Sequence, residues 1–280
     1  MKRFPIYVLS LLALGLLVFS CGKDQSNPVD EIPQEVIQKI SAMGFNPDGI
    51  EKVEEGYRIE RDIIITDELL KGAHVDVEVP NVEQYRTFNT VSTGGNRNIT
   101  VYIPQGGNNG FSSTYVAALD EAISRYNAEN LDLGFQRVSS SNGADIVFTR
   151  LSKRDERQGV LGSAGFPSSN GAPYGQIKMS GILQSTYGLG VNGIATIMAH
   201  EMGHCIGFRH TDYFDRSISC GGGTSNEGSG SVGAVHIPGT PTGANPSSDL
   251  SWMLSCTDGG NRPFTNNDRT ALGWMYINNY

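Results

Sequence analysis

Residues 199–212 read AHEMGHCIGFRHTD and contain three of the five histidines in the chain. His200 and His204 are four residues apart, so on a helix their imidazoles lie on the same face, one turn apart, where they can share one metal ion. Gly207 lets the chain leave the helix through a left-handed turn, after which His210 can reach the same ion from the side. The spacing therefore predicts a three-histidine metal site at the end of a helix.

Glu201 adds a candidate base to this ligand set. Three neutral nitrogen ligands with an open fourth position are typical of catalytic zinc, whereas structural zinc sites are usually closed by four protein ligands. Glu201 lies about 100° further round the helix than His200, where it can take a proton from a metal-bound water without being a ligand. A packing role for the histidines is the alternative, and it explains their clustering less well.

The full pattern HExxHxxGxxH resembles the motif of the metzincin metallopeptidases, and HEMGHCIGFRHTD is most similar to the dual-action HEIGH family of that clan. Met253, in SWMLSC, matches the methionine turn that metzincins carry beneath the zinc. The resemblance covers about residues 98–280 and implies a zinc endopeptidase with a cleft between two subdomains. It also implies that substrate lies antiparallel to an edge strand, which residues 159–166 or 175–181 could form.

The sequence departs from related families at two places. Astacins and serralysins carry a tyrosine two residues after the turn methionine, where this chain has Ser255, so no tyrosine switch is expected. Astacins also have a glutamate directly after the third histidine, where this chain has Thr211 and then Asp212. A buried salt bridge to a newly cleaved N-terminus is therefore not implied.

An upstream segment, IERDIII at residues 59–65, resembles the FxGDI prosegment of astacins, whose aspartate fills the open position on zinc. This resemblance implies that Asp62 is a latency ligand, although Arg61 stands where the motif has glycine. The alternative is a strand with an exposed aspartate. Because no cysteine lies between Cys21 and Cys205, a cysteine switch is excluded for this chain.

The first twenty residues predict export. Lys2 and Arg3 precede an apolar run over residues 4–19, which is short for a membrane span, so a signal peptide is favoured over a transmembrane helix. The ending VFSC resembles a bacterial lipobox and implies lipid on Cys21, followed by a tether over residues 21–30. We therefore expect a lipid-anchored protein of a bacterial cell envelope that faces the periplasm or the cell exterior.

Composition excludes some partners and leaves other questions open. The formal charge is -8 and no basic stripe is present, so nucleic acid is not an expected partner. Loops that contain aspartate and asparagine could bind calcium, but no EF-hand pattern supports it. After lipidation of Cys21 three cysteines remain, Cys205, Cys220 and Cys256, which allow at most one intramolecular disulfide in any of three pairings. The oligomeric state is left open.

The order of predicted elements gives an α/β (α+β) fold of metzincin type. We expect a small twisted mixed sheet, a second long helix over 113–130, an active-site helix over 193–206, an irregular lower subdomain and a C-terminal helix. The C-terminal helix begins at a capping-box pair, Thr265 and Asp268. Residues 57–66 are predicted to form one strand. The predicted domains are a signal peptide (1–20), the tether (21–30), a prosegment or N-terminal subdomain (31–90) and the catalytic domain (91–280).

Two histidines remain outside the motif. His236 is expected in a surface loop, where it could also border the cleft, and His74 is expected to be structural. The leading hypothesis is a zinc endopeptidase that acts on extracellular protein or peptide. The alternatives are a surface adhesion or glycan-associated binding lipoprotein on the same scaffold, which would not need Glu201, and a non-proteolytic zinc hydrolase.

Overall fold

Short strands of alternating or wholly apolar residues form a mixed sheet of eight strands, in the order β1-β2-β3-β8-β9-β7-β5-β6. The computed structural model describes residues 32–43, 45–71, 84–224, 226–227, 233–241 and 250–277. The strands of this sheet are β1 (Glu51–Val53), β2 (Gly56–Ile59), β3 (Ile63–Ile65), β5 (Arg97–Tyr102), β6 (Leu133–Val138), β7 (Ile146–Arg150), β8 (Gly162–Gly165) and β9 (Gln176–Met179). Strands β6, β5, β7 and β9 are parallel neighbours, whereas β8 runs antiparallel to β9. The predicted mixed sheet is thus confirmed.

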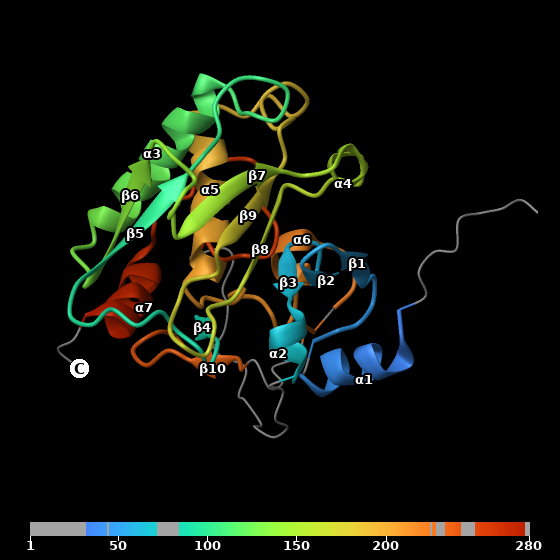
Figure 1. The fold of residues 1–280 in the computed structure, drawn as a ribbon. Helices are drawn as coiled ribbons and strands as arrows, with labels where there is room; N and C mark the ends of the chain where they lie inside the picture. The colour runs from blue at the N-terminus through green and yellow to red at the C-terminus, as the bar shows by residue number, and fades with distance from the viewer. Residues whose placement is uncertain are drawn as a thin grey trace, which may run out of the picture. The chain divides into compact units, whose positions relative to one another are not determined.

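Two long helices pack on this sheet and form the main core with it. They are α3 (Ser113–Asn127) and α5 (Val191–Cys205), which lie side by side in Figure 1. The Tyr126 hydroxyl of α3 donates a 2.7 Å hydrogen bond to the Ala199 carbonyl of α5. Because every residue of α5 from Gly193 to Cys205 is buried, burial rather than an amphipathic pattern stabilises this helix.

The remaining elements are short, apart from two further helices. They are α1 (Gln34–Ala42), α2 (Asp67–Lys71), α4 (Lys153–Arg157), α6 (Ser217–Cys220), α7 (Asn266–Tyr276) and a two-stranded ribbon of β4 (Tyr85–Arg86) and β10 (Val235–His236). Helix α7 begins with the predicted capping box, in which Thr265 accepts from the Asp268 N–H and Asp268 accepts from the Thr265 N–H. His236 lies in β10, partly buried beside Thr240, and not in a surface loop.

The prediction of one strand over residues 57–66 was wrong. These residues form a hairpin of β2 and β3, because Glu60 and Arg61 adopt positive φ angles of 55° and 80° and reverse the chain. The second strand then pairs in parallel with β8, so the hairpin belongs to the main sheet. Neither stretch expected to offer a free edge to substrate does so here, since β8 lies between β3 and β9, and β9 lies between β8 and β7.

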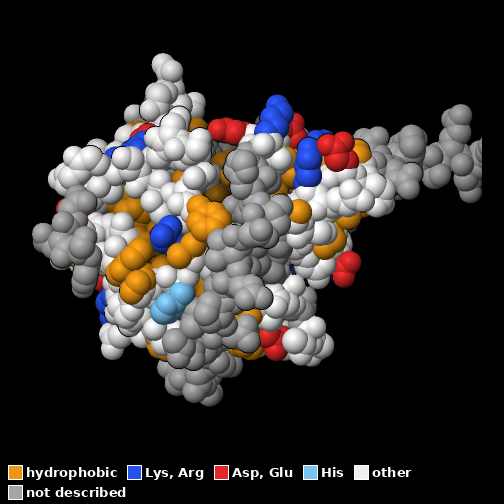
Figure 2. Space-filling view, turned by 90° about the horizontal axis from the view of Figure 1, so that it is seen from below, with side chains coloured by type: hydrophobic (Ala, Val, Ile, Leu, Met, Phe, Trp, Pro, Cys, Tyr) orange, Lys and Arg blue, Asp and Glu red, His pale blue; other side chains and the backbone are white. Residues whose placement is uncertain are grey.

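Residues 32–280 cluster as one compact unit. No helix among the described residues has the length and apolarity to span a membrane. Large exposed hydrophobic side chains in the described parts are Phe88, Tyr187 and Leu250. The face drawn in Figure 2 shows hydrophobic side chains interspersed with charged and other groups. Cys21 and His74 lie outside the described residues.

Candidate metal centre

The end of helix α5 has the turn that the third histidine requires. Gly207 has a φ of 106°, a left-handed conformation that favours glycine. Its N–H donates to the His204 carbonyl, and the Phe208 N–H donates to the Gly203 carbonyl, which together form a Schellman motif. The predicted end of the helix at Gly207 is confirmed, and the turn directs the following residues back to the helix.

Each of the three histidines is oriented by a hydrogen bond at Nδ1. The acceptors are the Trp252 carbonyl for His200 at 2.8 Å, the Phe208 carbonyl for His204 at 2.8 Å and the Glu227 carboxylate for His210 at 2.9 Å. When the ring is neutral, an acceptor at Nδ1 fixes the tautomer whose Nε2 carries a lone pair. In all three rings the unprotonated nitrogen is therefore Nε2, and it faces the other two rings.

These nitrogens converge with one carboxylate of the hairpin. One ligand atom from each of Asp62, His200, His204 and His210 lies within 4.8 Å of all the others. The Asp62 Oδ2 atom is 3.2 Å from His210 Nε2 and 3.8 Å from His200 Nε2. His204 Nε2 is buried and has no hydrogen-bond partner among the described residues. Three imidazoles and a carboxylate around one point, with a buried nitrogen otherwise unsatisfied, fit a zinc ion.

Charge in this cluster is unevenly distributed. Burial and the neighbouring His200 and His210 lower the pKa of His204, which favours the neutral ring that a metal requires. Burial opposes charge on Asp62, but His210 and His200 outweigh it and hold the pKa of Asp62 well below its usual range. Asp62 is therefore an anion, and its side chain is only 14% exposed, in contrast to the alternative of an exposed strand residue.

Glu201 borders the cleft that His200 and Asp62 also line. It is buried, and burial together with the Asp62 carboxylate raises its pKa well above the usual value. Strand β8 passes directly over it, since a Cβ at Gly162 would collide with the Glu201 carboxylate. Glycine at this position therefore makes room for the candidate base.

Met253, the expected turn methionine, packs against helix α5. A Cβ at Gly203 would approach its Sδ atom to 2.6 Å, so the methionine contacts the backbone of α5 between His200 and His204. The neighbouring Trp252 is also buried and donates from Nε1 to the Tyr126 hydroxyl at 3.1 Å. This segment therefore supports the helix that carries two of the three histidines.

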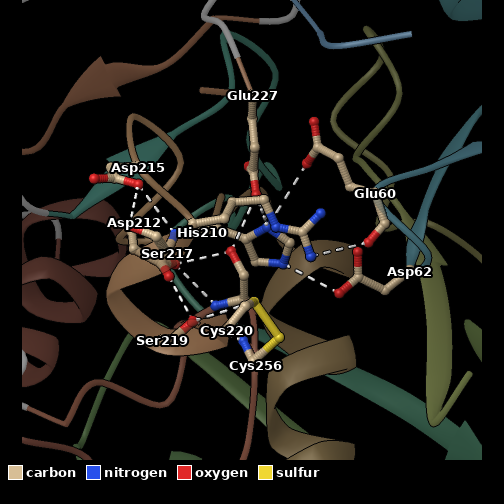
Figure 3. Close-up of a disulfide and its surroundings, with 12 residues drawn as sticks. Glu60, Asp62, His210, Asp212, Asp215, Ser217, Ser219, Cys220, Glu227 and Cys256 are labelled. Carbon is tan, nitrogen blue, oxygen red and sulfur yellow. Dashed lines mark hydrogen bonds and ion pairs between the residues drawn. A yellow bond between two sulfur atoms is a disulfide. The ribbon is translucent and has the colours of Figure 1, made fainter. Parts of the chain in front are cut away.

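Sequence reasoning missed Glu227, which lies 17 residues after His210 in a glycine-rich stretch without a motif. Its side chain is buried and accepts from His210 Nδ1 (Figure 3). Burial alone would raise its pKa, but His210 and Arg216 lower the pKa of Glu227 to about 2. Only the fold brings this carboxylate to the histidine, so no local signal could have identified it.

The loop around the turn methionine is covalently fixed. Cys220 and Cys256 form a disulfide, and Cys205 is free and buried, which resolves the pairing that the sequence left open (Figure 3). Asp212 accepts from the N–H and the hydroxyl of Ser255, at 2.9 and 2.8 Å, and thus links the third-histidine loop to the same segment. Ser255, in the position of the astacin tyrosine, therefore has a structural partner.

Comparison with known families shows to which family the chain belongs. The sequence model of the family described as dual-action HEIGH metallo-peptidase matches residues 57–276, which is most of the chain. The chain belongs to this metallopeptidase family. The match begins in strand β2. In this HEIGH metallopeptidase it therefore includes the hairpin that carries Asp62, the three histidines and Met253. A search of the curated proteins found no match.

Proposed function

We propose that this member of the HEIGH family is a zinc endopeptidase that hydrolyses peptide bonds of extracellular proteins or peptides. The observation that carries the proposal is the convergence of three histidine nitrogens at one point, with buried Glu201 on the same cleft. His200, His204 and His210 would hold the ion. Bound zinc would supply a Lewis acid that polarises the scissile carbonyl and acidifies a water molecule.

The protein groups supply the proton transfers. Glu201 accepts a proton from the attacking water and passes it to the departing amine, and its burial keeps solvent away from that proton. Glu227 holds His210 in the ligand tautomer through Nδ1. The Trp252 and Phe208 carbonyls do the same for the other two histidines.

In the full chain the hairpin of β2 and β3 keeps this site latent. Asp62 stands among the histidine nitrogens, where it would fill the fourth position on the ion. Strand β3 covers β8 through a parallel ladder, with the Ala164 N–H donating to the Asp62 carbonyl at 2.8 Å. The hairpin thus takes the sheet edge that an extended substrate would need. Arg61, in the place of the glycine of the astacin motif, nevertheless adopts the positive φ that glycine favours.

The test compares the parent chain from residue 22 with Glu201→Gln. Both are assayed for zinc by mass spectrometry and for casein cleavage, before and after limited trypsin digestion followed by a trypsin inhibitor. About one zinc is expected in each protein, with cleavage by the digested parent and a loss of roughly 10²–10⁴-fold in the variant. Equal activity in both would remove Glu201 from the mechanism. Zinc without cleavage in either would favour the alternative of a binding lipoprotein, which the family match does not support.

Lipid attachment at Cys21 would place the peptidase on the surface of a bacterial envelope membrane. The support is the apolar run after Lys2 and Arg3 and its small-residue ending before the cysteine. Expression of Cys21→Ser in a bacterium should move the protein from the membrane fraction to the soluble fraction and abolish labelling by radioactive palmitate. Membrane retention of the variant would contradict lipid anchoring.

A further inference from the structure

A cavity of about 140 Å³ opens at the candidate metal centre, where Asp62, His200 and Glu201 are among the residues that line it. Its walls include Thr196 and Ile197, which lie one turn before His200 on α5, and Leu254, which follows the turn methionine. A side chain of the residue next to a scissile bond would enter here, because a metal ligand, His200, and the candidate base, Glu201, also line the cavity. The residues that line this cavity therefore decide which side chains are accepted.

Arg262 lines this cavity, far in sequence from the histidine motif. The residue is only 8% exposed. Its NH1 group donates to the Cys256 carbonyl at 2.9 Å, and its backbone N–H donates to the Thr196 hydroxyl at 2.9 Å. Its Nε atom is buried and has no hydrogen-bond partner within the described parts of the chain. The guanidinium is therefore buried beside the cavity with its hydrogen-bonding capacity only partly used.

Charge compensation distinguishes Arg262, which is buried, from Arg216, a partly buried arginine that also lines the cavity. Arg216 lies 3.1 Å from the buried carboxylate of Glu227. Arg262 has an ion pair only with Asp258 among the described residues, at 3.5 Å, and the Asp258 side chain is 68% exposed. Because an exposed carboxylate is well solvated, it compensates a buried cation weakly. The positive charge of Arg262 is therefore available to a ligand.

We propose that Arg262 is a specificity-determining residue that selects substrates with aspartate or glutamate at one of the two positions that flank the scissile bond. The proposal rests on the peptidase function proposed above. A guanidinium binds a carboxylate through its N–H donors, and the NH2 group of Arg262, whose ion-pair partner is the exposed Asp258, is the donor that a substrate carboxylate would take over. Asp258 competes for the same cation from the solvent side, so its removal strengthens the selection.

The test uses the trypsin-digested chain, with trypsin inhibited, and internally quenched peptides that differ at the two flanking positions. Asp and Glu are compared with Asn, Gln, Leu and Lys. The parent is expected to cleave the acidic peptides roughly 10- to 100-fold faster, by kcat/KM, than their amide counterparts. Arg262→Gln should remove this ratio and Asp258→Asn should raise it, while Arg262→Lys retains part of it.

Controls separate specificity from folding. Arg125→Gln removes a neighbouring cation that donates to the Arg262 carbonyl but does not line the cavity, so it should leave the ratio unchanged. Thermal unfolding and zinc content show whether each variant folds, and a ratio taken within one variant does not depend on its total activity. Cleavage by the parent without acidic preference, or a preference that survives Arg262→Gln, overturns the proposal and leaves the peptidase function standing. Cleavage of no peptide, with the parent equal to Glu201→Gln, overturns both.

Discussion

Helix α5 and the hairpin of β2 and β3 meet at the same histidines, but different interactions stabilise them. Helix α5 has 15 residues with a buried core segment and a Schellman end. The hairpin has strands of four and three residues joined at Glu60 and Arg61, whose positive φ angles are unfavourable for side chains with a Cβ. The helix therefore forms from local hydrogen bonds and burial, whereas the hairpin depends on what it contacts.

The contacts of the hairpin include unfavourable ones. The Glu60 side chain is buried, and burial together with the charge of Glu227 raises its pKa well above the usual value. Favourable contacts offset this cost: the buried isoleucines of β3, the ladder to β8, and Arg58, which donates to Asp155 of α4 at 2.7 Å and also pairs with Glu51. The latency proposed above requires that the hairpin can be displaced while helix α5 stays folded.

Among the substitutions that test the difference between helix and hairpin, Asp62→Ala is expected to have the largest effect. Loss of the carboxylate among the histidine nitrogens should raise the peptidase activity of the undigested chain by about 100-fold, the equivalent of roughly 2.7 kcal/mol. Casein cleavage before trypsin treatment measures it. Glu68→Ala removes an exposed acidic side chain of α2 and serves as the matched control, with no change expected. Equal activity of the parent and Asp62→Ala would show that the aspartate does not maintain latency.

Asp155→Asn tests the link between the hairpin and helix α4. Burial opposes charge on Asp155, but Arg58 and Ser152 outweigh it and lower its pKa. Because the side chain is still 18% exposed, we expect a loss of about 1.5 kcal/mol at pH 7, the low end for a hydrogen bond to a charged group. Chemical denaturation measures it. Asp120→Asn, which removes a surface ion pair with Arg137, should change stability by less than about 0.5 kcal/mol.

The same pair gives a pH dependence with a definite sign. A depressed pKa in the folded state means that the Asp155 contribution is complete above the unfolded pKa of about 3.9 and is lost as the pH falls through the folded value. The stability difference between the parent and Asp155→Asn should therefore be constant at neutral pH and shrink below about pH 4. A difference that grows on acidification would contradict the assigned ion pair.

The smallest effect is expected from Arg61→Gly. Glycine adopts a φ of 80° without a Cβ clash, so the hairpin should gain stability, in part offset by the entropy that glycine loses on folding. We expect a net gain of roughly 0.5–1 kcal/mol and slower activation by trypsin. Because trypsin cleaves after arginine, activation is followed with a protease that cuts after hydrophobic residues as well. Faster activation by that second protease would show that Arg61 stabilises the hairpin.

Much of the fold and of the candidate site followed from local patterns. The period of α3, the capping box of α7 and the histidine spacing each depend on residues within one or two turns, where neighbours along the chain are neighbours in space. Residues 57–66 were misread because an alternating stretch followed by an apolar run is compatible with one strand or with two. The turn at Glu60 and Arg61 carries no glycine, so the sequence contained no reversal signal there.

The sequence alone identified the three histidines as candidate ligands, Glu201 as a candidate base and Gly207 as the end of the helix. Ligands on one helix and its exit loop need only the correct spacing along the chain. Only the tertiary structure brought Glu227 to His210, joined Cys220 to Cys256 and placed Arg262 in the cavity. These pairs are separated by 17 to 62 residues, with Arg262 counted from His200, and no periodicity links them. Their meeting depends on how the loops close over the sheet and helices, which is a property of the packed chain and not of any segment.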